Sequence, residues 1–305
     1  MSPRVSVVTP TYQRAATLPR LYDSLLRQSF HDFEWVVVDD GSSDDTGSLV
    51  RRWAAEAPFR IDYVRQANQG KHVAVNRGVE RSTGEFCALM DSDDWYAPQA
   101  LERMVASWET IPVERREGFA AVEGLCAYRD GELVGDRFPA DVFDSNSFEV
   151  LTVHGIRGDS IGMYRRDVLG RYPFPEDLGW HVKPALVWNR IAARWSTRFV
   201  NEVWAYKEYL PGGLTMRMGR LQLSFPAAQL VYWREFAGMP RRMRLRERVR
   251  AHANHVRFAL HCRHAPRRQL GESPNRALTV LVWPLGLLLY ARDRWRLAKE
   301  DDDAG

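Results

Sequence analysis

Cysteine is scarce in this chain of 305 residues, which contains only Cys87, Cys126 and Cys262. An odd number of cysteines cannot pair completely within one chain, and their wide spacing matches no metal-binding cysteine pattern. A disulfide-stabilised extracellular domain is therefore not expected, and a reducing compartment fits best. The sequence runs from Met1 directly into an apolar segment, so we expect no secretory signal.

The sequence also lacks an apolar run long enough to predict a membrane-spanning helix. Residues 277–291 are 15 uncharged residues interrupted by a proline and a glycine, whereas a helix that crosses a bilayer needs about 20 apolar residues. A re-entrant or interfacial segment fits better, with Trp283, Tyr290 and Trp295 near the lipid headgroups. The alternative is a buried helix with a basic face towards solvent.

Charge is nearly balanced but unevenly placed. The chain has 43 Lys and Arg against 39 Asp and Glu, whereas residues 236–305 have 15 against 7. We therefore expect a mildly acidic domain at 1–235 followed by a basic helical extension at 236–305. Arginines beside an apolar segment favour an anionic membrane surface, where each adds about 1 kcal/mol. Nucleic-acid binding is the alternative, but no aromatic stacking surface adjoins these arginines.

Strands and helices alternate over roughly the first 110 residues. Short apolar runs typical of buried strands are followed by segments in which apolar residues recur at helical spacing. The runs are residues 5–8, 35–38, 61–64 and 86–90. This alternation predicts a mostly parallel, Rossmann-like sheet with helices on both faces. Right-handed crossovers would bring the carboxyl ends of the strands to one edge.

Polar clusters follow each of these four strands, and that edge is where open α/β sheets bind ligands. The clusters are residues 10–12, 39–40, 68–71 and 91–94. Asp40 can accept hydrogen bonds from a nucleobase or a ribose, or can form a local turn at Gly41. Tyr12 can stack on a base, and Lys71 can neutralise a diphosphate or remain solvated. Together these residues indicate a nucleoside-diphosphate pocket.

The acidic cluster after the fourth strand is the most informative part of the sequence. Asp91, Asp93 and Asp94 lie within four residues, and such carboxylates repel one another unless a cation or solvent intervenes. Mg²⁺ and Mn²⁺ prefer carboxylate oxygens together with substrate phosphates. The alternative is a solvated acidic turn before a helix that starts near Pro98.

These motifs, in this order and spacing, resemble those of glycosyltransferase family 2, whose members have the GT-A fold. The matching segments are residues 5–12, 38–46, 68–78 and 84–95. The resemblance implies a nucleoside-diphosphate sugar donor, and uridine is the nucleoside that the family usually uses. It also implies a divalent metal (Mn²⁺ or Mg²⁺) and usually inversion at the anomeric carbon.

The resemblance also assigns roles to individual residues. Pro10, Tyr12 and Asp40 would hold the nucleobase. Lys71 would lie near the base or ribose side of the donor. The remaining residues on the donor side would be Asn68, Asp91 and Ser92.

The metal would be held at the acidic cluster. Asp91 and Asp93 would form the Asp-x-Asp pair that touches ribose and metal, and Asp94 is a competing metal ligand. Residues 1–110 would form the nucleotide-sugar half of the domain, and residues 111–235 the acceptor half.

The family pattern is looser after residue 115, although residues 119–128 and 160–164 have the character of strands. The family's catalytic base usually precedes a helix like that at Trp188, but residues 182–185 contain no carboxylate. Glu176 and Asp177 are the candidates for the base, and an exposed loop pair is the alternative reading.

Two further features belong to this second half. His181 is another candidate for the base, although a histidine in a surface loop is the more usual case. Residues 208–215 resemble a mobile segment on the acceptor side of the family, since adjacent glycines permit hinge motion.

Together these observations predict a cytoplasmic glycosyltransferase, peripherally bound to the inner face of the membrane. Its acceptor would be a saccharide or a lipid-linked molecule in cell-envelope or polysaccharide biosynthesis, and no nucleic acid is expected as a partner. A polyprenyl-phosphate sugar synthase is an alternative, because an ionised phosphate acceptor needs no strong base. A non-catalytic protein that binds nucleotide sugar or nucleic acid is a third.

Overall fold

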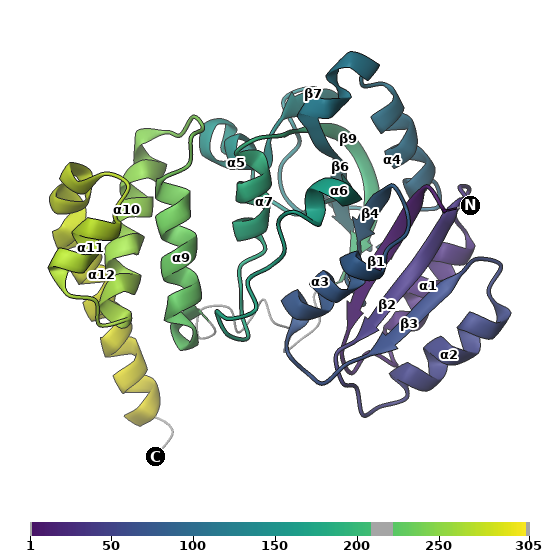
Figure 1. Cartoon of the computed structure of the whole chain (residues 1–305), viewed down its shortest axis with the longest axis horizontal. Coiled ribbons are helices and arrows are strands. Elements are labelled where there is room, and N and C mark those ends of the chain that lie inside the picture. Colours follow the sequence, from purple (N-terminus) through teal and green to yellow (C-terminus); the bar gives the residue numbers. More distant parts are fainter. Residues whose placement is uncertain (1, 209–221, 303–305) are drawn as a thin grey trace. The chain divides into compact units, whose positions relative to one another are not determined.

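The computed structural model describes residues 2–208 and 222–302 of the chain (Figure 1). These residues divide into two compact units. The first comprises residues 1–174 and 190–210, and the second comprises residues 175–189 and 211–305, within the described ranges. The predicted boundary at residue 235 lies within a helix of the second unit, and the division at that residue stays a prediction.

The first unit is built on a parallel sheet, as the sequence predicts. Its first four strands are β1 (Val5–Thr11), β2 (Phe33–Asp39), β3 (Ile61–Arg65) and β4 (Phe86–Leu89). They lie in the order β3-β2-β1-β4, and every neighbouring pair is parallel. Their carboxyl ends therefore share one edge of the sheet.

Helices cover both faces of this sheet. They are α1 (Leu18–Leu26), α2 (Thr46–Glu56), α3 (Lys71–Arg81) and α4 (Ala100–Glu109). Alternate strand residues point to opposite faces, so Val7 packs in the cluster formed with α1, α2 and α4, while Val8 meets α3. A Cβ atom on Gly78 of α3 would lie 2.3 Å from Val8, so this glycine permits the close approach of α3 to the sheet.

The second half of the sheet mixes directions. It contains β5 (Trp95–Tyr96), β6 (Phe119–Tyr128), β7 (Val142–Ser145), β8 (Ser160–Arg165) and β9 (Ser196–Lys207). Strand β8 lies antiparallel between β4 and β6, and β9 is parallel to β6 and antiparallel to β5 and β7. The expected fold class, a mostly parallel α/β sheet with surrounding helices, is confirmed.

Short helices connect these strands. They are a 3₁₀ helix at Val113–Gly118, α5 (Ser147–Glu149), a π-helical turn at Val150–His154, α6 (Arg166–Leu169) and α7 (Ala185–Ala192).

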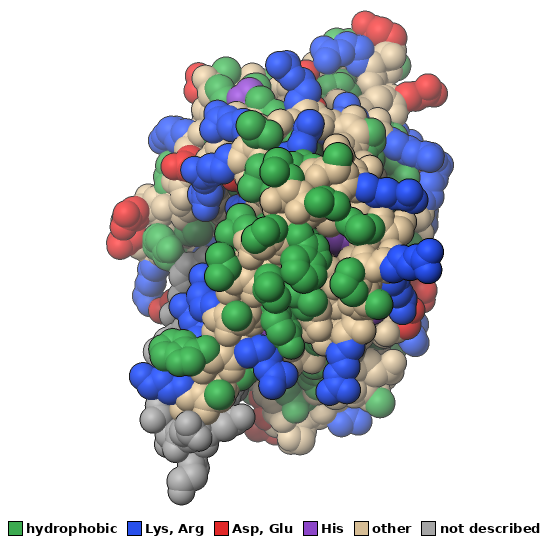
Figure 2. Space-filling view, turned by 90° about the vertical axis from the view of Figure 1, so that its left-hand side faces the viewer, with side chains coloured by type: hydrophobic (Ala, Val, Ile, Leu, Met, Phe, Trp, Pro, Cys, Tyr) green, Lys and Arg blue, Asp and Glu red, His purple; other side chains and the backbone are tan. Residues whose placement is uncertain are grey.

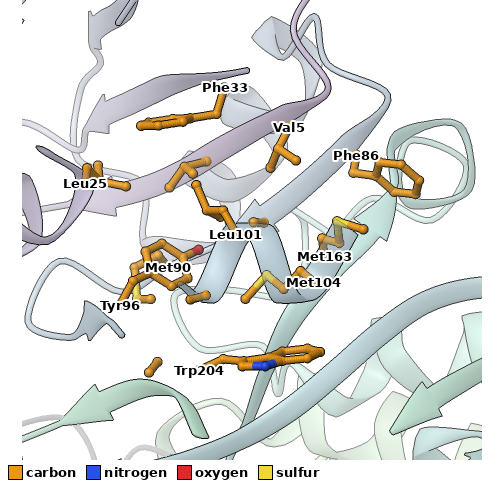
Figure 3. Packing of buried hydrophobic residues seen from close by; sticks show 14 of the residues in the cluster. Val5, Leu25, Phe33, Phe86, Met90, Tyr96, Leu101, Met104, Met163 and Trp204 are labelled. Atoms are coloured by element: carbon orange, nitrogen blue, oxygen red, sulfur yellow. The ribbon is translucent and has the colours of Figure 1, made fainter. Parts of the chain in front are cut away.

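A continuous apolar core lies between the sheet and the helices α1, α2 and α4 (Figure 3). Phe33 of β2, Phe86 of β4 and Trp204 of β9 are almost fully buried in it. Met90 is also buried, directly after β4. The apolar run that ends at the acidic cluster is therefore anchored in the core, which fixes where the carboxylates emerge.

The second unit is helical. Its helices are α9 (Pro226–Ala237), α10 (Leu245–His261), α11 (Pro266–Glu272) and α12 (Arg276–Asp302). Helix α12 packs along α10, where Arg257 and His261 bind the buried Asp293 at 2.5 Å and 3.1 Å.

The uncharged run at residues 277–291 lies within α12, which continues through Pro284. A Cβ atom on Gly286 would lie 2.6 Å from Val256 of α10, so this glycine serves close helix packing and does not break the helix. Among the described helices, none is both long and apolar enough to cross a membrane.

Candidate functional site

Three of the four predicted polar clusters are joined through Asp40, which follows β2. Its backbone N–H donates to the carbonyl of Thr11 at 2.8 Å. Its carboxylate accepts hydrogen bonds from the backbone N–H groups of Gln69 (2.9 Å) and Gly70 (2.8 Å) and from the Gln66 side chain (2.8 Å). Asp40 is buried, and it fixes the loop after β3 against the ends of β1 and β2.

Unpartnered oxygen atoms surround this junction. Among the described residues, Thr11 Oγ1, Gln66 Oε1 and Asn68 Oδ1 are buried and have no hydrogen-bond partner. Buried polar atoms normally have a hydrogen-bond partner, so these three unpartnered oxygens need an explanation. Hydroxyl and amide oxygens at the carboxyl ends of strands are suited to a polar planar ligand such as a nucleobase.

Tyr12 and Pro10 lie at the same edge, at the end of β1. The side chain of Tyr12 is 46% exposed although its neighbours in β1 are buried, so its ring presents a free face to solvent. Pro10 is buried within β1 opposite Val38. Asp39 next to Asp40 is not available to a ligand, because it accepts hydrogen bonds from Ser42 and Tyr63.

The acidic cluster emerges directly after β4. Asp91, Asp93 and Asp94 each offer one carboxylate oxygen, and these three oxygens lie within 4.8 Å of one another. Three hard oxygen donors at this spacing suit Mg²⁺ or Mn²⁺, which complete their coordination with water or phosphate. Ser92 is buried between them, and its carbonyl accepts a hydrogen bond from Thr17.

Each carboxylate of the cluster faces a basic side chain. Lys71 Nζ lies 2.5 Å from Asp91, Arg14 lies 3.3 Å from Asp93, and Lys207 Nζ lies 3.0 Å from Asp94. The Lys71 pair links the loop after β3 to the turn after β4, which completes the connection of all four predicted clusters. Three cations thus balance the three carboxylates.

Lys207 was not predicted from the sequence, and strand pairing explains its position. Trp95 of β5 pairs with Tyr206 of β9 in antiparallel register, which places the residue after Tyr206 beside the residue before Trp95. Lys207 also binds Asp159 at 3.2 Å. Lys207 lies far from Asp94 in sequence, so no local motif reveals the contact. Arg14 was also missed, since a single arginine in a loop is usually solvated.

Burial and neighbouring charges shift the pKa values of this cluster. Burial raises the pKa of Asp94 to about 7, against the opposing effect of Lys207. Burial acts to lower the pKa of Lys207, but Asp94 and Asp159 raise it, so the ammonium remains charged. Burial acts to raise the pKa of Asp91, but the positive charge of Lys71 lowers it.

A further arginine supports the turn. Arg20 of α1 donates to the backbone carbonyl of Asp93 at 2.9 Å, lies 4.3 Å from the centre of the Trp95 ring, and forms an ion pair with Glu208. Sequence reasoning missed it, because Arg20 reads as an exposed residue of an amphipathic helix. These contacts hold the backbone that carries the carboxylates.

The candidate catalytic bases lie in the second unit. Glu176 and Asp177 are exposed, in a turn between β8 and α7, and their role as the base stays a prediction. His181 follows in the same loop. The predicted acceptor-side segment falls mostly on residues 209–215, which lie outside the described residues.

Known proteins are similar in sequence to part of this chain. The profile of Glycosyl transferase family 2 matches residues 6–172. An uncharacterized glycosyltransferase of Nostoc sp. is 38% identical over 110 residues, which are 36% of this chain and 34% of the relative. A β-1,3-glucosyltransferase of Campylobacter jejuni, named for GalNAc(5)-diNAcBac-PP-undecaprenol, is 35% identical over 126 residues, or 41% of this chain and 38% of that protein. The matches therefore span little more than a third of these relatives.

Solved structures share the fold over almost the whole chain. TarS 1–349 of S. aureus in complex with UDP-GlcNAc has a TM-score of 0.60 at 18% identity, over 98% of this chain and 92% of that one. The mannosyltransferase PcManGT of Pyrobaculum calidifontis, in complex with GDP-Man and Mn²⁺, has a TM-score of 0.57 at 23% identity, over 97% and 81%. With the profile covering more than half of its residues, this chain belongs to glycosyltransferase family 2.

Proposed function

We propose that the chain transfers a sugar from a nucleoside-diphosphate sugar, by preference a UDP-sugar, to a saccharide or lipid-linked acceptor. The observation that carries the proposal is the convergence of four polar segments at one sheet edge, joined through Asp40 and the Lys71–Asp91 pair. Membership of glycosyltransferase family 2 and the donors bound by structural neighbours support it.

The nucleobase occupies the edge around Asp40 in this proposal. The Tyr12 ring stacks on the base, and the unpartnered oxygens of Thr11, Gln66 and Asn68 supply the polar contacts. Asp40 acts mainly by holding the loop that carries two of these residues. Pro10 shapes the floor of the same edge.

The diphosphate lies between Lys71 and the acidic cluster. A divalent cation, Mn²⁺ or Mg²⁺, held by Asp91, Asp93 and Asp94 would stabilise the negative charge that develops on the departing diphosphate. Lys71 and Arg14 form ion pairs with Asp91 and Asp93 in the structure. When these carboxylates bind a cation instead, both basic side chains can turn to the phosphates.

Transfer proceeds with inversion in this proposal, with Glu176 or Asp177 accepting the proton of the acceptor hydroxyl. Both side chains are exposed, which is compatible with this role once an acceptor binds. The acceptor belongs to cell-envelope or polysaccharide biosynthesis, and the basic C-terminal extension associates peripherally with the inner face of the membrane. The relative from Campylobacter jejuni, named for an undecaprenol-linked substrate, supports this acceptor class.

A polyprenyl-phosphate acceptor is the second candidate. It is favoured by one specific observation: residues 182–185, where the family's base is expected, contain no carboxylate. A phosphate oxygen is already ionised at neutral pH and attacks without a base. Substitution of both Glu176 and Asp177 by glutamine and asparagine distinguishes the candidates, because transfer to a hydroxyl would be lost and transfer to a phosphate would not.

Release of nucleoside diphosphate from a panel of UDP-, GDP- and dTDP-sugars, with candidate acceptors and Mn²⁺, tests the activity. The proposal predicts release that depends on the acceptor and a product of inverted anomeric configuration by NMR. Donor binding without release under any of these conditions would favour the non-catalytic alternative.

A further inference from the structure

Helix α12 has an outer face with no polar side chain over about two and a half turns. Thr279, Val282 and Gly286 point towards α10 and are buried. The opposite side of the same segment is exposed and entirely apolar. We call it the α12 outer face, and its residues are Val280, Leu281, Pro284, Leu285, Leu287 and Leu288.

This face is unusually apolar for a surface in water. Leu281 is 76% exposed and Leu288 is 68% exposed. A helix that is apolar all round is normally covered on every side, and contiguous exposed apolar patches mark interaction sites. Figure 2 shows hydrophobic side chains gathered on this side of the molecule, with Lys and Arg side chains around them.

The charges beside the α12 outer face are positive. Arg276 precedes it, and Arg292, Arg294 and Arg296 follow it, all exposed. Between residues 276 and 299 the only acidic residue is Asp293, which is buried against α10 and paired with Arg257. The surface around the face therefore presents uncompensated positive charge.

We infer that the α12 outer face docks on the surface of an anionic lipid bilayer, with the helix lying in the plane of the interface. An apolar stripe flanked by arginines is complementary to acyl chains beneath anionic headgroups. Trp295, which is 66% exposed, lies where an aromatic ring meets the headgroup level. The segment has too few consecutive apolar residues to span a bilayer, so the helix lies on the membrane surface.

Other occupants fit the face less well. A second copy would bring two sets of arginines together, while Asp293, the one acidic residue between residues 276 and 299, is buried and already paired with Arg257. A nucleic acid would satisfy the arginines but would leave the leucines in water. The bilayer is the partner whose chemistry matches both the apolar stripe and its cationic border. Docking there deepens the membrane association in the proposed function and rests on it.

Flotation of the full chain with vesicles tests the inference. We expect binding to vesicles of phosphatidylcholine mixed with phosphatidylglycerol, and much weaker binding to phosphatidylcholine alone. The double variant Leu281→Gln and Leu288→Gln should lower the partition coefficient by about tenfold or more. The matched control is Leu245→Gln, since Leu245 of α10 in the same unit is 72% exposed and lies outside the α12 outer face. The wild type, the double variant and Leu245→Gln should have the same midpoint of thermal unfolding, which shows that all three are folded.

A charge variant with Arg292, Arg294 and Arg296 changed to glutamine should lose the preference for anionic vesicles. The inference is overturned if the wild-type chain does not float, or if the double variant floats as well as the wild type. The inference is also overturned if ultracentrifugation shows a dimer of the wild type that the double variant does not form. Retention of the wild type, but not of the double variant, on single-stranded DNA would overturn it as well. Nucleotide binding without vesicles is a separate measurement, so failure of the proposed function would leave the flotation result interpretable.

Discussion

Lys207 of β9 binds two carboxylates that are far from it in sequence, Asp94 at 3.0 Å and Asp159 at 3.2 Å. The side chains of Lys207 and Asp94 are 17% and 9% exposed, so the pair lies in a poorly solvated position. An ion pair of this kind is costly to break, because removal of one partner leaves the other charge buried without compensation.

Substitution of Lys207 by methionine should therefore destabilise the protein by about 3 kcal/mol, measured by denaturant unfolding. The control is Lys299→Met, since Lys299 is exposed near the end of α12, and its substitution should change stability by less than about 0.5 kcal/mol. Equal stability of the two variants would show that Asp94 does not depend on Lys207.

The sequence predicted the acidic end of β4 and the site residue Lys71, but not Lys207 and Arg14, which also face the acidic cluster. The four apolar runs and the polar residues after them are local signals, and the parallel order of the strands follows from the alternation with helices. The contact between Lys207 and Asp94 depends on the pairing of β5 with β9, which no local pattern encodes. Arg14 and Arg20 were missed because an arginine in a loop or on the polar side of an amphipathic helix is usually solvated.

The C-terminal helices show a second limit of local signals. Pro284 and Gly286 are helix breakers by propensity, yet α12 continues through both of them. Packing of α12 on α10 overrides this preference, and the approach at Val256 requires a residue without a Cβ atom at position 286. The apolar character of the segment was visible in the sequence, but which side faces α10 was not.

Asp40 should prove to be a structural residue as well as part of the donor site. In Asp40→Asn, an amide N–H₂ replaces one oxygen and meets a backbone or side-chain donor, since the carboxylate accepts from Gln66, Gln69 and Gly70. We expect a loss of about 1–3 kcal/mol in the free energy of unfolding together with weaker UDP binding. The exposed Asp23→Asn is the control, and unchanged stability of Asp40→Asn would contradict the role in holding the loop.

Gly78 should tolerate no side chain where α3 crosses β1. The Cβ atom of Gly78→Ala would lie 2.3 Å from Val8 Cγ1, so α3 must shift, at a cost of about 1–3 kcal/mol. In Gly271→Ala the new methyl group meets nothing within 4 Å, and better helix propensity should leave stability unchanged or raised by up to about 1 kcal/mol. Chemical denaturation of both variants measures the difference, and similar effects at the two sites would contradict the packing argument.

The C-terminal helices should lose stability in mild acid. Burial, together with the positive charges of His255 and Arg248, lowers the pKa of His252 to about 4, and its Nδ1 lies 2.8 Å from Thr279 Oγ1. The unfolded chain binds a proton near pH 6.5, so the unfolded state gains protons first as the pH falls. Stability is therefore full above about pH 6.5 and declines towards pH 4.

The pH dependence of the thermal midpoint, compared between the wild type and His252→Asn, checks this. The variant should show a shallower decline between pH 6.5 and pH 4, because the titrating group is gone. Burial also lowers the pKa of His255, so part of the decline should remain. A decline as steep as that of the wild type would assign the acid sensitivity to other groups.

The central claim is that the edge of the sheet from Tyr12 to the acidic cluster binds a nucleoside diphosphate with a divalent cation. Calorimetric titration of UDP, GDP and dTDP in the presence of Mn²⁺ or EDTA, on the wild type, Asp93→Ala and the exposed control Glu80→Gln, tests it most directly. The account predicts binding that requires Mn²⁺, that is lost in Asp93→Ala and that is kept in Glu80→Gln. Absence of binding by every nucleotide to the wild type with metal present would contradict it.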